Sequence, residues 1–197
     1  MLNTIEKAIE DLKEGKMVII VDDESRENEG DLMMSAEFCS PEKMAFMIRH
    51  TGGVVCVPII KSIADKFKLG PMVENNTDKF STPFTVSVDA VKTKTGISAE
   101  DRCRTVRTFV DDSAVLNDLS RPGHVFPLIA QDGGVSVRQG HTEASVELCR
   151  LAGLKPVAVI SEMMNDDGTM MRGKDLKNFS KQWNIPLISI KDIIDTK

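Results

Sequence analysis

Residues 16–36 read KMVIIVDDESRENEGDLMMSA and place a dense run of acidic side chains between two apolar segments. The apolar run predicts a buried strand over residues 16–21, and residues 32–36 predict a second strand. The ten residues between them, 22–31, hold six carboxylates, against which Arg26 is the single cation. The sequence therefore predicts a negatively charged loop at the mouth of a hydrophobic element.

The acidic loop is suited to a cation. Carboxylates at this density repel one another and resist burial, and a hard divalent ion such as Mg²⁺ prefers oxygen ligands. An ordinary solvated loop is the alternative. The loop is not an EF-hand, because placing Gly30 at the sixth position puts Ser25 at the first and Ala36 at the twelfth, where Asp and Glu are required.

The whole chain is ordinary in composition, with 197 residues, 41% hydrophobic and 28% charged. This length supports one substantial core, and no repeat or linker divides it. No stretch approaches the roughly 18 apolar residues of a membrane span, and the N-terminus lacks a signal-peptide pattern. The net charge of −5 argues against non-specific nucleic-acid binding.

The four cysteines form no CxxC pair. Wide spacing of this kind argues against a structural zinc site and a disulfide scaffold, and it fits reduced thiols in the cytoplasm. The cysteines are Cys39, Cys56, Cys103 and Cys149.

Helices and strands are mixed without strict alternation. Apolar periodicity and capping residues predict helices over residues 3–14, 41–50, 62–67, 98–109, 142–152 and 175–183. Further strands are predicted over residues 54–59, 84–88, 157–160 and 187–190. The expected fold is an α/β (α+β) protein, a three-layer α/β/α sandwich with a mixed sheet, in a single domain over residues 1–197.

Two histidine-containing segments could carry chemistry. Residues 121–127, RPGHVFP, predict a rigid turn that presents His124, although an ordinary surface histidine is the alternative. At residues 138–144, RQGHTEA, a glycine-containing turn enters a helix with Thr142 as its expected N-cap. Helix N-termini attract phosphate, a role that Arg138 would support, and His141 is placed to bind a metal or move a proton. A plain capped helix with an exposed arginine is the alternative there.

Glu162 stands where a buried strand ends, which suits an acid or base, although a salt-bridged structural acid fits equally. Residues 166–168 predict a simple turn. Composition and spacing alone thus indicate metal-assisted chemistry on a phosphorylated small molecule.

Five motifs in order extend this interpretation. The chain closely resembles the 3,4-dihydroxy-2-butanone 4-phosphate synthase family of riboflavin biosynthesis, nearly end to end. The motifs are DDESRENEGD (22–31), TGISA (95–99), RPGHVFPL (121–128), GHTEA (140–144) and NDDGTM (165–170).

The resemblance implies a lyase that converts D-ribulose 5-phosphate to L-3,4-dihydroxy-2-butanone 4-phosphate and formate. It further implies Mg²⁺ (or Mn²⁺), with two ions per active site, and a homodimer. The expected chemistry is metal-assisted enediolate formation, dehydration, skeletal rearrangement and loss of formate.

Residue by residue, the resemblance makes Glu27 and His141 the metal ligands, and His124 and Glu162 the residues needed for catalysis. The substrate-binding residues that it implies are Arg26, Glu27, Asp31, Arg138, Gln139, Gly140, His141, Thr142 and Glu162.

The chain departs from the family pattern at a few points. Ser161 stands where many members have Cys, and Gly52-Gly53 replaces a pattern that often carries an Arg. The cysteine-rich zinc motif of the fused GTP cyclohydrolase II domain found in many relatives is not in this sequence, so we expect a monofunctional protein or an excised domain. A catalytically inactive sugar-phosphate sensor and a nucleotide-binding relative in tRNA modification are the alternative functions.

Overall fold

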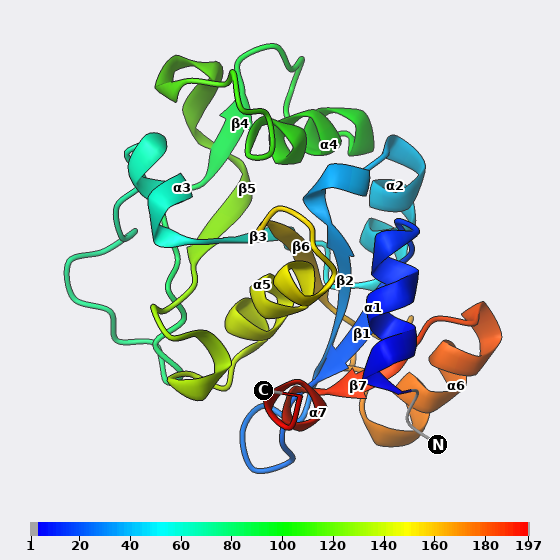
Figure 1. Cartoon of the computed structure of the whole chain (residues 1–197). Coiled ribbons are helices and arrows are strands. Elements are labelled where there is room, and N and C mark those ends of the chain that lie inside the picture. The colour runs from blue at the N-terminus through cyan, green and yellow to red at the C-terminus, as the bar shows by residue number, and fades with distance from the viewer. Residues whose placement is uncertain (1–3, 197) are drawn as a thin grey trace.

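The computed structural model describes residues 4–196, and within them seven strands form one sheet in the order β4-β5-β3-β6-β2-β1-β7 (Figure 1). The strands are β1 (Val18–Val21), β2 (Gly30–Ser35), β3 (Cys56–Ile59), β4 (Val88–Ala90), β5 (Leu119–Ile129), β6 (Ala158–Glu162) and β7 (Leu187–Ser189). The β1–β7 and β3–β5 pairs are parallel and the other pairs antiparallel, which confirms the mixed sheet.

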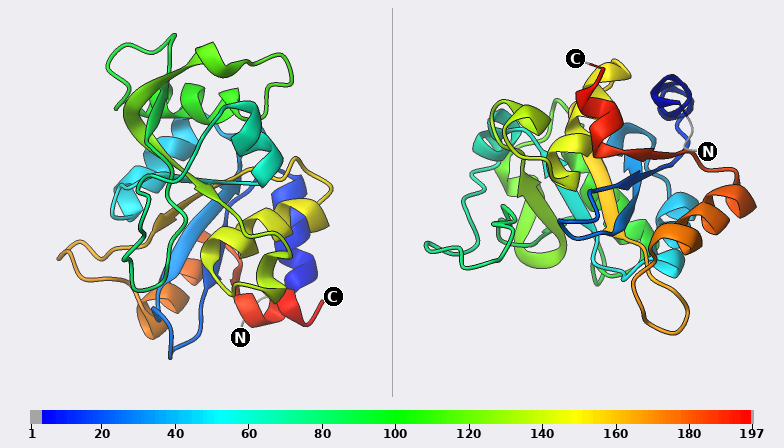
Figure 2. Two further views of the ribbon diagram at one scale, coloured as in Figure 1. Left: turned by 90° about the vertical axis from the view of Figure 1, so that its left-hand side faces the viewer. Right: turned by 90° about the horizontal axis from the view of Figure 1, so that it is seen from below.

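Helices cover both faces of the sheet. The α-helices are α1 (Ile5–Lys13), α2 (Pro41–His50), α3 (Lys61–Lys66), α4 (Ala99–Thr108), α5 (His141–Leu151), α6 (Gly173–Trp183) and α7 (Ile190–Ile194). The 3-10 turns are η1 (Ala36–Phe38), η2 (Leu116–Asp118) and η3 (Gly134–Ser136). Figure 2 shows α1, α5 and α7 on one side of the sheet and α2 and α6 on the other, which gives the expected three layers.

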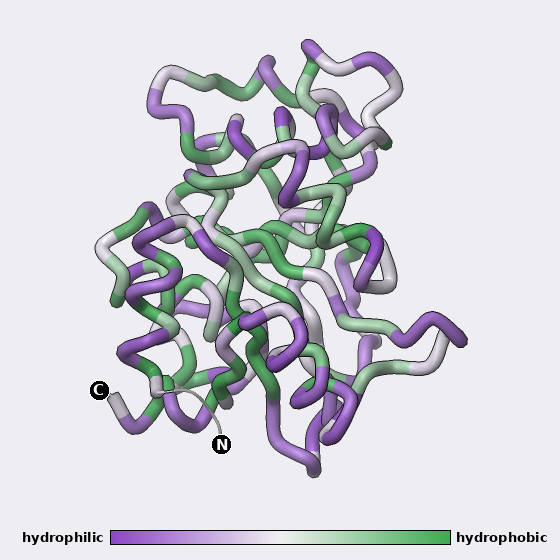
Figure 3. The backbone as a smooth tube through the Cα atoms, turned by 90° about the vertical axis from the view of Figure 1, so that its right-hand side faces the viewer, coloured by the Kyte–Doolittle hydropathy of each residue, from purple (hydrophilic) through white to green (hydrophobic). Residues whose placement is uncertain are grey.

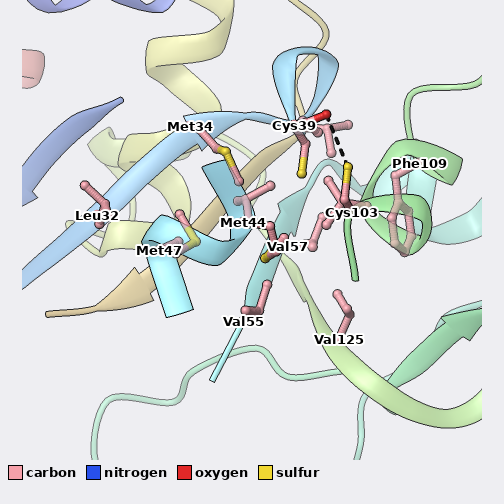
Figure 4. Packing of buried hydrophobic residues seen from close by; sticks show 14 of the residues in the cluster. Leu32, Met34, Cys39, Met44, Met47, Val55, Val57, Cys103, Phe109 and Val125 are labelled. Carbon is pink, nitrogen blue, oxygen red and sulfur yellow. Dashed lines mark hydrogen bonds between the residues drawn. The ribbon is translucent and has the colours of Figure 1, made fainter. Parts of the chain in front are cut away.

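Two buried clusters fill the spaces between these layers. Along β1, Ile19 joins the cluster beneath α2, α4 and α6, whereas Val18 and Ile20 join the cluster beneath α1, α5 and α7. This alternation follows from the two-residue period of a strand. Figure 4 shows the first cluster, where the Cys103 thiol donates to the Cys39 carbonyl oxygen at 3.3 Å. Figure 3 shows that the central strands are mostly hydrophobic, whereas hydrophobic and hydrophilic residues alternate along the outer helices.

Most helix starts agree with the sequence predictions. Ser40 and Ser98 accept backbone N–H bonds at the starts of α2 and α4, as their capping patterns predict. The predicted start of the first helix at Asn3 lies outside the described residues, and Thr4 caps α1. One short helix, α7, was not predicted. Ser189 and Asp192 form a capping box at its start.

The predicted turn at residues 121–127 is wrong, because this segment lies inside β5. Proline and glycine normally interrupt strands, but tertiary pairing overrides that tendency here. Pro127, which has no N–H to give, still accepts from Thr85 N at 3.0 Å. Gly123 lies directly against the backbone of β4, where a Cβ would overlap it. The Arg121–Pro122 bond is cis.

Two boundaries also differ from the predictions. The N-cap of α5 is Gly140, not Thr142, and Thr142 lies in the first turn with only 2% of its surface exposed. In the segment predicted as a strand at 84–88, the regular strand begins at Val88, and Phe84 makes only an isolated bridge. None of the helices within residues 4–196 is long and apolar enough to cross a membrane.

Candidate active site

A pocket of about 590 Å³ opens where the acidic loop, the end of β6 and the start of α5 meet. Seven of the residues implied by the family resemblance line it, namely Arg26, Glu27, Asp31, Arg138, His141, Thr142 and Glu162. Gln139, Gly140 and His124 do not line it. The structure therefore brings together most of the expected site, from segments more than 100 residues apart in sequence.

Strand register explains how the two ends of the chain converge. Asp31 on β2 lies directly opposite Glu162, the last residue of β6, in an antiparallel pair. Both carboxylates therefore lie at the same end of these two neighbouring strands. The acidic loop, which joins β1 to β2, is at this end. Glu162 is the last residue of β6 and lines the pocket, so its predicted position at the end of a strand is confirmed.

Asp22 fixes the shape of the acidic loop, a role that the sequence did not reveal. Its Oδ2 accepts from Arg26 Nη1 at 3.0 Å and from Glu27 N at 2.9 Å, and its Oδ1 accepts from Glu29 N at 2.9 Å. The Asp22 side chain is 1% exposed. Three N–H donors satisfy the oxygens of this buried carboxylate, and one of them is the backbone N–H of Glu27, so Asp22 holds Glu27 in place.

The residues around His141 fit a divalent cation. Glu27 Oε2 lies 3.4 Å from His141 Nδ1, and ligand atoms of Asp22, Glu27 and His141 all lie within 4.8 Å of one another. His141 Nε2 and Asp31 Oδ1 are buried and have no hydrogen-bond partner among the described residues. Burying such atoms unsatisfied is costly, and a bound cation would remove that cost.

The crowded carboxylates change the proton affinities of the site. Burial lowers the pKa of His141, but Asp31, Glu27 and Asp22 outweigh it and raise that pKa to about 9. Burial raises the pKa of Asp31 to about 7. Burial, with the charges of Glu29 and Glu27, raises the pKa of Glu162. Uncompensated negative charge of this kind is the environment that a divalent cation neutralises.

Arg138 lines the pocket and is mostly buried, so the alternative of an exposed arginine is wrong. Its Nη1 lies 2.7 Å from Oε2 of the fully buried Glu143, its Nη2 donates to the Phe80 carbonyl oxygen at 3.2 Å, and its side chain is 15% exposed. Gly140 leaves room for this guanidinium, because a Cβ there would overlap it. The start of α5 and Arg138 therefore form a positively polarised end of the pocket.

His124 lies away from this pocket. Its Nδ1 is 2.7 Å from Asp89 Oδ2, and its backbone N–H donates to Asp89 Oδ1 at 2.9 Å. Leu128 of the same strand lines the pocket, four residues further along, which corresponds to roughly 13 Å at strand spacing. The imidazole is 42% exposed and oriented by Asp89.

Other pocket residues could not be identified from the sequence. Arg172, just before α6, donates to the Asn28 carbonyl oxygen at 2.9 Å and pairs with Glu29 at 2.8 Å. Phe80 also lines the pocket. Arg172 contacts residues that lie far away in the sequence. Neither Arg172 nor Phe80 belongs to a motif whose chemistry is evident from the sequence alone.

The two departures from the family pattern have clear places in the fold. Ser161 lines the pocket, and its hydroxyl donates to Thr51 Oγ1 at 2.8 Å. The Gly52 backbone N–H donates to the Glu162 carbonyl oxygen at 2.8 Å. The Gly53 carbonyl oxygen accepts from Arg102 Nη1 at 2.8 Å. The substituted positions therefore support the strand end that carries Glu162.

Curated relatives match the chain over most of its length. Riboflavin biosynthesis proteins RibBA from Bacillus mycoides (strain KBAB4) and Bacillus cereus (strain AH187) are each 52% identical over 194 residues. The match covers 98% of this chain and 49% of each relative. The chain thus spans about half the length of the curated relatives it matches.

Solved structures share the fold. A 3,4-dihydroxy-2-butanone 4-phosphate synthase in complex with two magnesium ions is 43% identical with a TM-score of 0.96, over 98% of this chain and 96% of that one. The Candida albicans synthase is 42% identical with a TM-score of 0.93, over 100% and 98% of the two chains. Residues 6–196 match the family described as 3,4-dihydroxy-2-butanone 4-phosphate synthase. The chain therefore belongs to the 3,4-dihydroxy-2-butanone 4-phosphate synthase family of enzymes.

Proposed function

We propose that this chain is a lyase that converts D-ribulose 5-phosphate to L-3,4-dihydroxy-2-butanone 4-phosphate and formate in riboflavin biosynthesis. The observation that carries the proposal is one pocket with two kinds of lining. Glu27 and His141 belong to a cluster that could hold a cation, and Arg138 lies just before the start of α5. Family membership over nearly the whole chain supports it. We further propose that residues 1–197 form a single domain, which acts in the cytoplasm on a small molecule and not on nucleic acid.

Glu27 and His141 are the proposed protein ligands for Mg²⁺ or Mn²⁺. A similar synthase has been solved with two magnesium ions, which supports two ions here. When bound, such ions act as Lewis acids on carbonyl and hydroxyl oxygens of the substrate. The neighbouring Asp31 and Glu162, whose pKa values are raised, would accept and return protons next to the ketone.

The phosphate end of the substrate is proposed to bind at the start of α5. Arg138 offers a guanidinium already oriented by Glu143, and Gly140 is the N-cap of α5, whose first backbone N–H groups have no acceptor within the helix. Arg26 approaches from the acidic loop. Holding the phosphate in this way fixes the reacting end near Glu27 and Glu162.

A homodimer is proposed to account for His124. This residue lies outside the pocket of its own chain, with an exposed imidazole that Asp89 orients. In a dimer, His124 of one copy could complete the pocket of the other. Mixing inactive His124→Ala protein with inactive Glu27→Gln protein should then restore activity, because one of the mixed sites is intact. Absence of restored activity in verified mixed dimers would contradict this arrangement.

The activity itself is tested by incubating the purified chain with ribulose 5-phosphate and Mg²⁺ and measuring formate enzymatically. We expect formate release that stops in excess chelator and returns when Mg²⁺ is added. Tight binding of ribulose 5-phosphate without formate would instead identify a sugar-phosphate-binding protein and refute the proposal.

The ligand assignment has a separate test that needs no turnover. Glu27→Gln and His141→Asn should each weaken Mn²⁺ binding, measured by calorimetry, by more than the roughly 10–100-fold that loss of an outer-shell partner costs. Glu24→Gln is the matched control, because Glu24 is an exposed acid of the same loop. Equal Mn²⁺ affinities in Glu27→Gln and Glu24→Gln would show that Glu27 is not a ligand.

A further inference from the structure

Residues 78–82 form a short surface segment beside the pocket, and hydrogen bonds within this segment hold Phe80 in place. Asp78 Oδ2 accepts from Phe80 N at 3.1 Å, from Thr82 N at 2.8 Å and from Thr82 Oγ1 at 2.9 Å. Asn76 Nδ2 donates to the Thr82 carbonyl oxygen at 2.9 Å. This segment, the Phe80 turn, belongs to the long loop at the left of Figure 1. Its shape is therefore fixed locally although most of it is exposed.

Phe80 contacts two arginines that come from different parts of the fold. The Arg26 guanidinium carbon lies 5.0 Å from the centre of the Phe80 ring, which is a cation–π distance. The Phe80 carbonyl oxygen accepts from Arg138 Nη2 at 3.2 Å. Phe80 is half-buried and lines the pocket together with both arginines.

Each arginine is thus held from two sides. Asp22 and Glu27 each lie 3.0 Å from Arg26 Nη1, and Glu143 lies 2.7 Å from Arg138 Nη1. Phe80 supplies a further contact in both cases. A guanidinium carries five N–H groups in a fixed fork, so these contacts leave donors that can face the pocket. Two oriented guanidinium groups at one rim suit a phosphate monoester.

We propose that Phe80 is a positioning residue that orients Arg26 and Arg138 together for the phosphate group of the substrate. This inference rests on the proposed function and names a residue that acts through the two arginines without itself reacting. The ring restrains Arg26 through its face, and the backbone carbonyl restrains Arg138. Loss of the aromatic face should therefore weaken phosphate binding and leave the proton-transfer groups in place.

The test compares Phe80→Leu, which keeps apolar bulk, with Phe80→Tyr, which keeps the ring. We expect Phe80→Leu to raise the KM for ribulose 5-phosphate and the calorimetric Kd for inorganic phosphate by roughly tenfold, with kcat changed less than about twofold. Phe80→Tyr should stay near wild type. Phe38→Leu is the matched control, because Phe38 makes a cation–π contact with Lys43 away from the pocket.

Three outcomes would overturn the inference: an unchanged phosphate Kd in Phe80→Leu, equal loss in Phe80→Leu and Phe80→Tyr, or a fall in kcat alone. If Phe80→Leu does not fold, Phe80→Met, which also removes the ring, is combined with Arg26→Gln in a double-mutant cycle on the phosphate Kd, and additivity of the two effects would refute the coupling. Phosphate calorimetry needs no turnover. If the wild-type protein binds phosphate but releases no formate, the proposed function is refuted. The phosphate Kd values of the Phe80 variants would still test the role of Phe80.

Discussion

At the residue scale, the pocket gathers charged side chains from parts of the chain that lie far apart in sequence. The places of Glu27 and His141 in the pocket could be predicted because they belong to ordered motifs, and that of Glu162 because it ends a buried strand. Asp22 and Phe80 could not, because their roles arise from contacts rather than from residue type. Asp22 is one of six acids in residues 22–31, and the three N–H donors to its carboxylate distinguish it.

Gly140 gives a residue-scale prediction. Gly140→Ala should displace the Arg138 guanidinium, because the added Cβ would overlap it and lie 3.0 Å from Glu143 Oε2. We expect a several-fold higher Kd for inorganic phosphate and a loss of about 1–3 kcal/mol of stability from overpacking. Calorimetry and urea unfolding measure the two effects. Gly70→Ala is the control, since a Cβ there meets nothing within 4 Å; similar behaviour of the two variants would contradict the account.

His50 gives a pH prediction. It packs against Phe46, Phe179 and Trp183 at centroid distances of 4.5, 5.2 and 5.3 Å, and burial lowers its pKa below the ordinary 6.5. Asp166 opposes this shift and Arg49 adds to it. Because the unfolded chain binds the proton more tightly, the stabilising contribution of neutral His50 is present above pH 6.5 and is lost as the pH falls through the lowered pKa.

The measurement is the free energy of unfolding of the wild type minus that of His50→Phe, between pH 5 and pH 8. This difference cancels the other titrating groups and should decrease toward low pH. A flat difference curve would rule out the lowered pKa. Trp183 is the single tryptophan of the chain, so its fluorescence reports unfolding next to His50.

At the element scale, local signals predicted the helices well and the strands less well. Capping residues and the apolar period are local, so α2 and α4 begin where the sequence indicates. Strand β5 depends on pairing with β3 and β4, which overrides the turn tendency of its proline and glycine residues. The Gly140 cap of α5 was missed because Thr142 is the stronger capping residue by type but lies inside the helix.

The Ser98 cap gives an element-scale prediction. Ser98 Oγ accepts from Asp101 N at 3.0 Å at the start of α4. Ser98→Ala should therefore lower the free energy of unfolding by about 1 kcal/mol, measured in urea. Ser62→Ala in the first turn of α3, where no side chain caps the helix, replaces an exposed serine by a better helix former and should be nearly neutral. Equal effects of the two substitutions would exclude a capping role.

At the scale of the whole molecule, one sheet carries both cores and the pocket. Three layers with a mixed sheet follow from the mixture of elements, and the structure confirms them. The strand order could not be predicted, because it depends on which long-range pairings form. The convergence of Asp31 and Glu162 is one consequence of that order.

The shared sheet predicts cooperative unfolding of a single unit. Leu148 of α5 and Met47 of α2 are fully buried on opposite faces. Leu148→Ala and Met47→Ala should each cost about 2–5 kcal/mol and move the whole transition. Circular dichroism and Trp183 fluorescence should give the same urea midpoint in each variant. Separate midpoints would show that the two faces belong to independently unfolding units.

The proposed activity of this chain is the conversion of D-ribulose 5-phosphate to a four-carbon phosphate and formate in the pocket that Glu27, His141 and Glu162 line. The most direct measurement is a ¹³C NMR time course with uniformly labelled ribulose 5-phosphate, Mg²⁺ and the purified chain. We expect one labelled formate and one labelled four-carbon sugar phosphate for each molecule of substrate consumed by the wild type. We expect neither product with Glu27→Gln. Unchanged substrate, or a five-carbon isomer without formate, would contradict it.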